Sequence, residues 1–337
     1  MSLSVVVRTR NEADRLRLTL ASLAVQTAQS EVVVVNDGSS DHTYDVIEDA
    51  VRSSGVKAVH IEAPKGRSGA ANAGARAARS EFLLFLDGDT LAGPDLVRCH
   101  MEVHARSPKS VARGELLHLR GTRFLRDPEL CTPQLNATDK VDRLSRAERD
   151  RLRITRSEIA CNFPTIHDRA EFGLYPGVAP RMLQNLELQA IRQSPLCSVN
   201  WAAASGSNQS VPREAFLTLG GFNESLDINE HRELALRLCK FGLKMTVAEG
   251  ARSYHMTHRS GWRDPLEDHG WELAFYGLHP IPEVKLLSVL WASLAPNRRV
   301  PQRFRIDSLP ALESAARLLS GKEIDSVRAA LGLVALN

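Results

Sequence analysis

The chain has 337 residues, of which 43% are hydrophobic and 25% charged, and this ordinary globular composition excludes a generally disordered protein. Its 43 basic and 40 acidic side chains give a formal net charge of +3, without the basic excess typical of nucleic-acid-binding proteins. No apolar run reaches the ~18 residues that span a bilayer, and the five scattered cysteines form no Cys-x-x-Cys pair. We therefore expect a cytoplasmic protein with reduced cysteines and no bound nucleic acid.

Predicted strands and helices alternate along the first 105 residues. Short apolar runs predict buried strands at 4–7, 31–35, 56–61 and 82–86. Apolar residues at helical spacing follow Asn11, which we expect to cap the first helix. This alternation predicts an α/β fold with a mainly parallel sheet flanked by helices. Ligands of such sheets bind beyond the carboxyl ends of the strands, where the polar clusters 9–12, 36–41 and 87–89 fall.

The pattern changes twice in the rest of the chain. Residues 115–200 have irregular apolar spacing and six interrupting prolines, so we expect loops and short helices there. A helix predicted at 230–241 turns Leu234, Leu238 and Phe241 toward the core, and 265–337 is expected to be mostly helical. These changes of pattern divide the chain into residues 1–110, 111–200 and 201–260 and a helical C-terminal extension at 261–337.

The tripeptide Asp87-Gly88-Asp89 directly follows the predicted strand at 82–86. Two carboxylates at a strand end can ligate a hard divalent cation, and the glycine between them lets a phosphate approach the backbone. Asp-Gly is also a common turn without a ligand, but its position at the ligand-binding edge favours a site. In the turn-like cluster 36–41, we expect Asp41 to cap a helix and Asp37 to bind at the strand tip.

Three familiar signatures are missing or incomplete. No Gly-x-Gly-x-x-Gly follows the first strand and no Gly-x4-Gly-Lys-Ser/Thr occurs, which argues against a dinucleotide-dependent dehydrogenase and a P-loop enzyme. His100 and His104 are spaced like a two-histidine zinc site, but Met101 stands where the zinc-peptidase pattern requires glutamate.

Further blocks give the acidic tripeptide a context. Besides 85–89, they are 5–12, 34–41, 69–74, 201–213 and 220–224. In this order and spacing the blocks resemble the family 2 glycosyltransferases of the GT-A fold. The resemblance covers roughly 1–105 and 200–260, and it implies a nucleotide-sugar-binding GT-A domain. It further implies that 1–110 is the nucleotide-binding half, 111–200 a variable acceptor segment with loops and 201–260 the donor-sugar and catalytic half.

The resemblance assigns roles to individual residues. It implies that Asp87 contacts ribose and metal, and that Asp89 ligates the Mn2+ or Mg2+ that bridges two phosphates. Asp37 is expected at the uracil edge, with Thr9 and Arg67 near the base, so a UDP-sugar is the favoured donor. The complete set expected to bind the donor is Thr9, Arg10, Asp37, Arg67, Asp87, Gly88, Ser205 and Gly206.

The expected catalytic residues are Glu230 and His231. Family members usually have Glu-Asp here, and this aspartate is the general base of inverting members. Histidine accepts protons near neutral pH, so we expect an inverting transfer that uses this pair. The related polypeptide N-acetylgalactosaminyltransferases have Glu-Asn and retain configuration, so the stereochemistry stays open. The alternatives are a solvated helix face with a Glu233–Arg237 pair, and Asp227 as the base.

Residues 252–255 resemble a block of the polypeptide N-acetylgalactosaminyltransferases whose histidine completes the metal site. An imidazole beside carboxylates and phosphate oxygens suits manganese. The expected metal ligands are therefore Asp87, Asp89 and His255, with His258 as a competitor of His255.

Together these features predict a metal-dependent glycosyltransferase for hexosyl or N-acetylhexosaminyl transfer from a nucleoside diphosphate sugar to a soluble acceptor. The acceptor stays open among small molecules, carrier-bound intermediates and peptides; peripheral membrane contact and homo-oligomers are compatible with the sequence. One alternative is a nucleotidylyltransferase, although the usual glycine-rich basic loop after the first strand is absent. The other is a non-catalytic GT-A-like nucleotide-sugar-binding module, favoured by His231 in place of aspartate.

Overall fold

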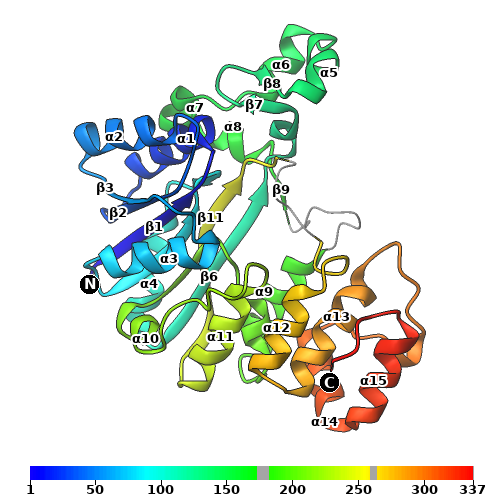
Figure 1. Cartoon of the computed structure of the whole chain (residues 1–337). Coiled ribbons are helices and arrows are strands. Elements are labelled where there is room, and N and C mark those ends of the chain that lie inside the picture. The colour runs from blue at the N-terminus through cyan, green and yellow to red at the C-terminus, as the bar shows by residue number, and fades with distance from the viewer. Residues whose placement is uncertain (173–181, 259–263, 337) are drawn as a thin grey trace.

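The computed structural model describes residues 1–172, 182–258 and 264–336. In this part of the chain, nine strands form one mixed sheet in the order β3-β2-β1-β4-β10-β6-β11-β5, with β9 paired to β6 (Figure 1). The strands are β1 (Leu3–Thr9), β2 (Glu31–Asp37), β3 (Lys57–Ile61), β4 (Phe82–Asp87), β5 (Thr90–Ala92), β6 (Ser110–His118), β9 (Glu171–Phe172), β10 (Gln209–Pro212) and β11 (Lys244–His255).

The N-terminal half of the sheet is parallel, as the alternation of strands and helices predicts. Its strands are apolar on both faces because helices cover both faces. Val5 and Val7 of β1 pack in a core with α1, α2 and α4, whereas Val6 packs in a second core with α3. These helices are α1 (Ala13–Ala24), α2 (Thr43–Ser54), α3 (Gly66–Ala77) and α4 (Leu96–Arg106).

The other half of the sheet is built on β6 and β11, which pair in parallel. Residues 244–247 pair with 110–113, and 252–255 pair with 115–118, so the four residues 248–251 bulge opposite Gly114. Strand β5 pairs antiparallel with the end of β11. Residues 115–118 belong to the long central strand β6, so the expectation of loops and short helices in 115–200 was wrong for the start of that segment.

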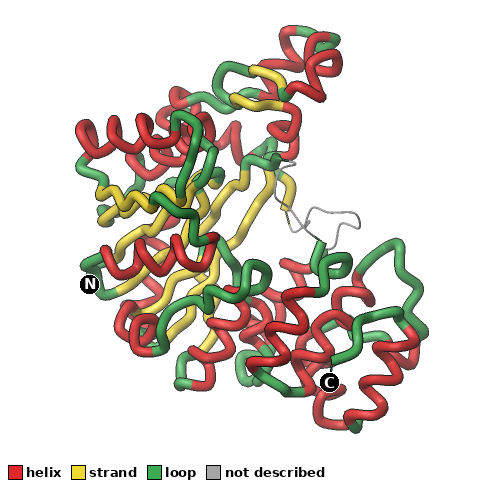
Figure 2. The backbone as a smooth tube through the Cα atoms, in the orientation of Figure 1, coloured by secondary structure: helices red, strands yellow, loops and turns green. Residues whose placement is uncertain are grey.

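Residues 119–170 form an arm whose tip projects away from the sheet (Figures 1 and 2). The buried Arg15 side chain of α1 ties down its base, donating hydrogen bonds to the carbonyls of Leu125 at 2.6 Å and Arg126 at 3.1 Å. The elements of the arm are the 3-10 helices η1 (Arg120–Phe124) and η2 (Leu135–Ala137), the strands β7 (Leu125–Asp127) and β8 (Thr132–Pro133), and the helices α5 (Thr138–Asp142), α6 (Arg146–Leu152), α7 (Arg156–Cys161) and α8 (Phe163–His167).

The C-terminal half adds helices that extend the core beside α3. Trp271, Trp291 and Leu312 of the last helices belong to the same buried cluster as Val6 of β1. The elements are α9 (Leu183–Gln193), η3 (Asn200–Ala203), α10 (Arg213–Thr218), α11 (Glu230–Lys240), α12 (Gly270–Leu278), α13 (Pro282–Leu294), η4 (Gln302–Phe304), α14 (Leu309–Leu318) and α15 (Gly321–Ala330). Among the described residues, no helix has both the length and the hydropathy of a membrane span.

Three local expectations were wrong. Phe241 is 55% exposed, because α11 ends one residue earlier and the chain leaves the buried stripe. Asn11 has a positive φ of 54° and precedes the helix cap; its side chain accepts a hydrogen bond from the Ser40 backbone N–H. Asp41 is not the N-cap of α2, since that position is His42, although its carboxylate accepts from the N–H groups of Thr43 and Ala13.

Candidate active site

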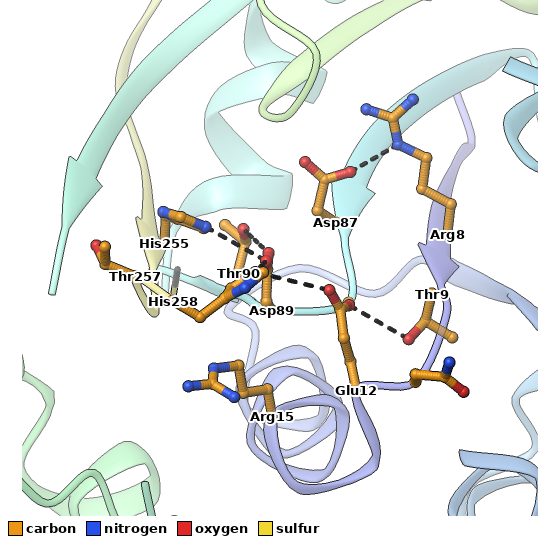
Figure 3. A network of polar contacts seen from close by, with 12 residues as sticks. Arg8, Thr9, Glu12, Arg15, Asp87, Asp89, Thr90, His255, Thr257 and His258 are labelled. Carbon is orange, nitrogen blue, oxygen red and sulfur yellow. Dashed lines mark hydrogen bonds and ion pairs between the residues drawn. The ribbon is translucent and has the colours of Figure 1, made fainter. Parts of the chain in front are cut away.

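The carboxyl ends of β1 and β4 lie side by side and carry the acidic tripeptide. In the register of these parallel strands, Arg8 is paired with Asp87. The end of β11 reaches the same edge, because His255 pairs with Thr90 in the short strand β5. Segments separated by more than 150 residues of sequence thereby meet at one place, shown in Figure 3.

The buried Asp89 carboxylate faces two imidazole rings. Its Oδ2 lies 2.7 Å from Nε2 of His258 and 3.3 Å from Nε2 of His255. The Thr90 hydroxyl donates a 3.0 Å hydrogen bond to the other carboxylate oxygen, which fixes the orientation of the group. We call Asp89, His255 and His258 the Asp89 cluster; their ligand atoms all lie within 4.8 Å of one another.

The charges of Asp89 and His255 in this cluster shift each other's pKa values. Burial alone would raise the pKa of Asp89, but His255 and His258 outweigh burial and hold the pKa well below its usual range. Burial likewise would lower the pKa of His255, yet Asp89 raises it above the ordinary value. The pocket around Asp89 thus favours positive charge. Protons on imidazoles are exchanged for metal ions in sites of this composition.

Glu12 supplies a second carboxylate beside this cluster. Its Oε1 lies 3.8 Å from His258 Nε2, and its Oε2 accepts a 3.5 Å hydrogen bond from the Thr9 hydroxyl (Figure 3). Burial raises the pKa of Glu12 well above normal, and the charges of Asp89 and Asp87 add to the effect. A Cβ at Gly88 would lie 2.6 Å from the Thr9 hydroxyl oxygen, so the tripeptide needs glycine to pack at this position.

Asp87 belongs to a different network, centred on Arg8. The guanidinium of Arg8 donates at 2.6 Å to Asp87, at 3.2 Å to Glu230 and at 3.2 Å to the carbonyl of Gly206. Burial would lower the pKa of Arg8, but the two carboxylates outweigh burial and raise it. The structure therefore separates the aspartates that the sequence grouped as metal ligands: Asp87 pairs with an arginine, whereas Asp89 faces histidines.

Glu230 and His231 lie side by side at the start of α11. Glu230 is only 2% exposed; burial favours its protonation, but His231 and Arg8 prevail and lower its pKa far below the usual range. Nε2 of His231 lies 2.8 Å from a nitrogen of Arg232. A guanidinium can only donate hydrogen bonds, so Nε2 of His231 is the acceptor. Burial also lowers the pKa of His231. His231 is thus neutral, with its Nδ1 3.6 Å from the carboxylate of Glu230.

A buried ion pair fixes the first turn of α11. Arg232 donates at 2.7 Å to Glu187 of α9, and the other oxygen of Glu187 lies 2.7 Å from Arg113 of β6. A further 2.7 Å bond runs from Arg232 to the carbonyl of Ala202. This arrangement connects four elements that are distant in the sequence. Composition and periodicity give no signal for it.

The solvated-face alternative for this helix was wrong, because Glu233 is 1% exposed. Its expected partner Arg237 is present at 2.7 Å, and His279 of the C-terminal helices lies 2.8 Å from the same carboxylate. The alternative base Asp227 is exposed, in the loop before α11.

The residues expected near the nucleotide lie at the ends of β1 and β2 and in two loops. Asp37 accepts backbone hydrogen bonds from Lys65 at 2.7 Å and Gly66 at 2.9 Å, which fixes the loop before α3. Each of its oxygens is therefore engaged with the protein. Among the others, Thr9 is buried, whereas Arg10 and Arg67 are exposed beside the same edge.

The 205–207 segment lies against the Arg8 network. The Ser205 hydroxyl bonds to the carbonyl of Ser207, and the Ser207 hydroxyl accepts a 3.2 Å hydrogen bond from the backbone N–H of Asp87. The carbonyl of Gly206 accepts from Arg8. Ser205 and Gly206 are thus brought to the same edge as the acidic tripeptide.

His100 and His104 lie elsewhere, buried between α4 and the sheet. The nitrogens of His100 lie 2.8 Å from the Ser210 hydroxyl and 2.8 Å from the Asn208 side-chain oxygen, and Nε2 of His104 lies 2.7 Å from Ser210. Burial lowers the pKa of His100 to about 4 and that of His104 to about 3. Both are neutral core residues that attach α4 to β10.

A mixed sheet with acidic residues at the carboxyl edge of its parallel half is the arrangement expected of the predicted GT-A α/β fold. A family model described as glycosyl transferase family 2 matches residues 4–158, so this region of the chain is similar to that family. The chain is also 30% identical over 266 residues to the validoxylamine A glucosyltransferase of Streptomyces hygroscopicus subsp. jinggangensis, covering 76% of this chain and 56% of that protein.

A second relative matches a shorter stretch. The poly-β-1,6-N-acetyl-D-glucosamine synthase of Staphylococcus epidermidis is 32% identical over 108 residues, which is 32% of this chain and 26% of that enzyme. The chain thus spans between a quarter and just over half of these two relatives.

Solved structures share the fold at low sequence identity. S. aureus TarS 1–349 in complex with UDP-GlcNAc superposes with a TM-score of 0.52 at 16% identity, covering 98% of this chain and 71% of that one. The mannosyltransferase PcManGT from Pyrobaculum calidifontis, in complex with GDP-Man and Mn2+, gives a TM-score of 0.50 at 16% identity, covering 98% and 74%. These likenesses confirm the predicted GT-A fold.

Proposed function

We propose that this protein transfers a sugar from a nucleoside diphosphate sugar, with a UDP-sugar favoured, to an acceptor in a metal-dependent reaction. The observation that carries the proposal is the Asp89 cluster at the carboxyl edge of a GT-A sheet. It is supported by fold neighbours solved in complex with UDP-GlcNAc, or with GDP-Man and Mn2+. The names of the relatives, glucosyltransferase and N-acetylglucosamine polymer synthase, fit a hexosyl or N-acetylhexosaminyl donor.

Asp89 and His255 are proposed to hold the cation, Mn2+ or Mg2+. A bound cation would offset the charge that develops on the leaving diphosphate. Thr90 orients the Asp89 carboxylate, and Gly88 leaves space at the backbone beside it. We propose that Arg8, which holds Asp87 and Glu230 together, orders this side of the donor site.

The nucleoside is proposed to lie against Thr9, Arg10, Asp37 and Arg67, where β1, β2 and the start of α3 meet. Asp37 fixes the loop that leads to Arg67 and has free lone pairs for a base edge, since a carboxylate oxygen can accept more than one hydrogen bond. The sugar is proposed to lie near Ser205 and Gly206, which contact the Arg8 network.

Glu230 is proposed to receive the proton of the acceptor, and His231 to orient Glu230. In the structure His231 and Arg8 together keep the pKa of Glu230 low, which makes Glu230 a weak base. The base role therefore requires that both contacts weaken, with Arg8 shifting its hydrogen bonds from Glu230 toward the donor. The proposed outcome is inversion, and retention is the alternative.

A panel assay tests the proposed function. The purified chain is incubated with UDP-Glc, UDP-GlcNAc and GDP-Man, with and without Mn2+, and the products are followed by phosphorus and proton NMR. A glycosyltransferase releases nucleoside diphosphate and free or transferred sugar, and the anomeric proton coupling of a transferred sugar reports inversion or retention. Formation of nucleoside triphosphate and sugar 1-phosphate after addition of pyrophosphate would indicate the nucleotidylyltransferase, and tight binding without turnover would indicate a binding module.

Variants of α11 test the catalytic roles. Glu230→Gln should cut turnover by about 10²-fold or more, the scale of general-base loss, while UDP binding persists. His231→Gln should cost less, because it keeps a hydrogen-bonding side chain beside Glu230. Asp227→Asn is the matched control on the preceding loop. A large loss in Asp227→Asn with near-normal turnover in Glu230→Gln would move the base to Asp227.

A further inference from the structure

Three donor atoms at the Asp89 cluster already have the spacing of ligands around one cation. Ligand atoms at right angles, with bonds of about 2.1 Å, lie about 3.0 Å apart. The two imidazole nitrogens lie 2.7 Å and 3.3 Å from the same Asp89 oxygen, on either side of this value. Both rings present Nε2 to that oxygen. One carboxylate with two histidines is a triad that leaves open coordination positions.

From this geometry we infer that the cation of the proposed glycosyltransferase is held by Asp89, His255 and His258, with Glu12 as a charge-balancing carboxylate beside them, and that Asp87 is not a ligand. The inference deepens the proposed function and rests on it for the role of the cation. It assigns a metal-binding role to His258 and a charge-balancing role to Glu12, both outside the acidic tripeptide, and it removes one residue of that tripeptide from the site.

The contacts of Asp87 support its exclusion. Oδ1 of Asp87 accepts a 2.6 Å hydrogen bond from Arg8. The same guanidinium also donates to Glu230 and to the carbonyl of Gly206. A ligand role for this Asp87 oxygen would require it to leave a buried guanidinium that keeps its charge throughout the normal pH range. Asp87 also does not belong to the group of ligand atoms that lie within 4.8 Å of one another. Figure 3 shows Asp87 and Arg8 on one side of the tripeptide and the Asp89 cluster on the other.

The place of Glu12 follows from charge. A divalent cation at the Asp89 cluster would meet one negative charge, and buried charge is costly unless it is compensated. Glu12 lies 3.8 Å from His258 and is positioned by the Thr9 hydroxyl. A second carboxylate beside the cluster would balance the charge of the cation and leave coordination positions for diphosphate oxygens.

The donor set also predicts which cation binds. Imidazole nitrogen suits transition metals, whereas Mg2+ prefers carboxylate oxygen and water. A site with two imidazoles should therefore bind Mn2+ without a nucleotide present, and Mg2+ much more weakly. A site made of Asp87 and Asp89 alone would show little preference between these ions.

Direct metal binding without nucleotide tests the inference. Free Mn2+ is counted by electron paramagnetic resonance and Mg2+ binding by calorimetry, for the wild type, Asp89→Asn, His255→Gln, His258→Gln, Glu12→Gln, Asp87→Asn and the surface control His60→Gln. Mn2+ affinity should fall at least about 10-fold for the Asp89, His255 and His258 variants, and less for Glu12→Gln. It should stay within about twofold of wild type for Asp87→Asn and His60→Gln, and Mg2+ should bind the wild type at least about 10-fold more weakly than Mn2+.

Three results would overturn the inference: wild-type Mn2+ affinity in His258→Gln, an equal loss in Asp87→Asn and Asp89→Asn, or equal affinity for the two ions. Unfolding curves without metal show which variants fold. If His258→Gln fails to fold, His258→Asp replaces it; this variant keeps a ligand oxygen and should retain part of the Mn2+ affinity of the wild type. Since the readout uses neither donor nor acceptor, a chain that binds Mn2+ through this triad without transferring sugar would disprove the proposed function and leave the metal site standing.

Discussion

Two pairs of histidines, closely spaced in the sequence, have opposite environments in the fold. His100 and His104 are enclosed by α4 and β10, and their hydrogen-bond partners are the neutral side chains of Ser210 and Asn208. His255 and His258 face the carboxylate of Asp89. Burial lowers the pKa values of the first pair, whereas Asp89 raises that of His255 despite its burial. The partner, rather than spacing or burial, determines whether a histidine pair can take up positive charge.

The largest expected effect concerns the enclosed pair at acid pH. The folded-state pKa values of His100 and His104 are about 4 and about 3, below the ordinary 6.5. Below pH 6.5 the unfolded chain therefore binds more protons, and stability falls as the pH falls. Each histidine costs up to about 1.4 kcal/mol per pH unit, or about 5 kcal/mol for the pair by pH 4.5.

Urea unfolding at pH 6.5, 5.5 and 4.5 measures this loss. The variant His100→Gln/His104→Gln should show a shallower decline than the wild type, whatever its stability at pH 6.5. Parallel curves for the two proteins would show that other groups cause the acid sensitivity.

The second effect concerns the pair that faces Asp89. Mn2+ at about 100 times its dissociation constant should stabilise the folded chain by about 2.7 kcal/mol, because the unfolded chain lacks the site. The stabilisation should be absent in Asp89→Asn and retained in His100→Gln/His104→Gln. Thermal unfolding with and without Mn2+ measures it, and an equal shift in all three proteins would indicate binding elsewhere.

A substitution can make the two pairs alike. In Asn208→Asp, His100 would face a carboxylate as His255 does, and the pKa of His100 should rise above 4, which NMR titration of the ring protons measures. Asn208 also donates at 3.0 Å to the carbonyl of Glu115 and at 2.9 Å to that of Ala251. Loss of these donors should cost about 2 kcal/mol at pH 7. An unchanged pKa of His100 would contradict the conclusion that the partner sets the charge of a buried histidine.

The smallest expected effect tests how Asp89 is held. In Thr90→Val the carboxylate loses the hydrogen bond that fixes its second oxygen. Mn2+ affinity should fall about 10-fold, equivalent to about 1.4 kcal/mol, a typical cost of removing the partner of a metal ligand. Mn2+ titration by electron paramagnetic resonance measures the change, with Thr27→Val, on the loop after α1, as the control. Equal affinities for wild type and Thr90→Val would show that the Thr90 hydroxyl does not position the ligand.

The sequence was informative where neighbours in the chain determine the structure. The strands at 4–7 and 82–86 are evident because both of their faces are buried, and the acidic tripeptide is evident because it ends the second of them. Strand β6 was missed because it carries Arg113 and Glu115, whose partners are far away in the sequence. The different surroundings of Asp87 and Asp89 could not be predicted either. They depend on long-range contacts, above all those with Arg8 and His258.

The bulge in β11 makes the length of residues 248–251 decisive. Neighbouring side chains of a strand point to opposite faces, so if the bulge keeps its shape, losing or gaining one residue shifts the later pairing by one and turns every later side chain over. After the gain of one residue Tyr254, which now packs among apolar side chains of the arm and α1, would face Asp89 in place of His255. Changes of two residues would restore the original faces. Even and odd changes in the length of this short segment would therefore have opposite effects on the site: even changes keep His255 on the face of Asp89, and odd changes remove it.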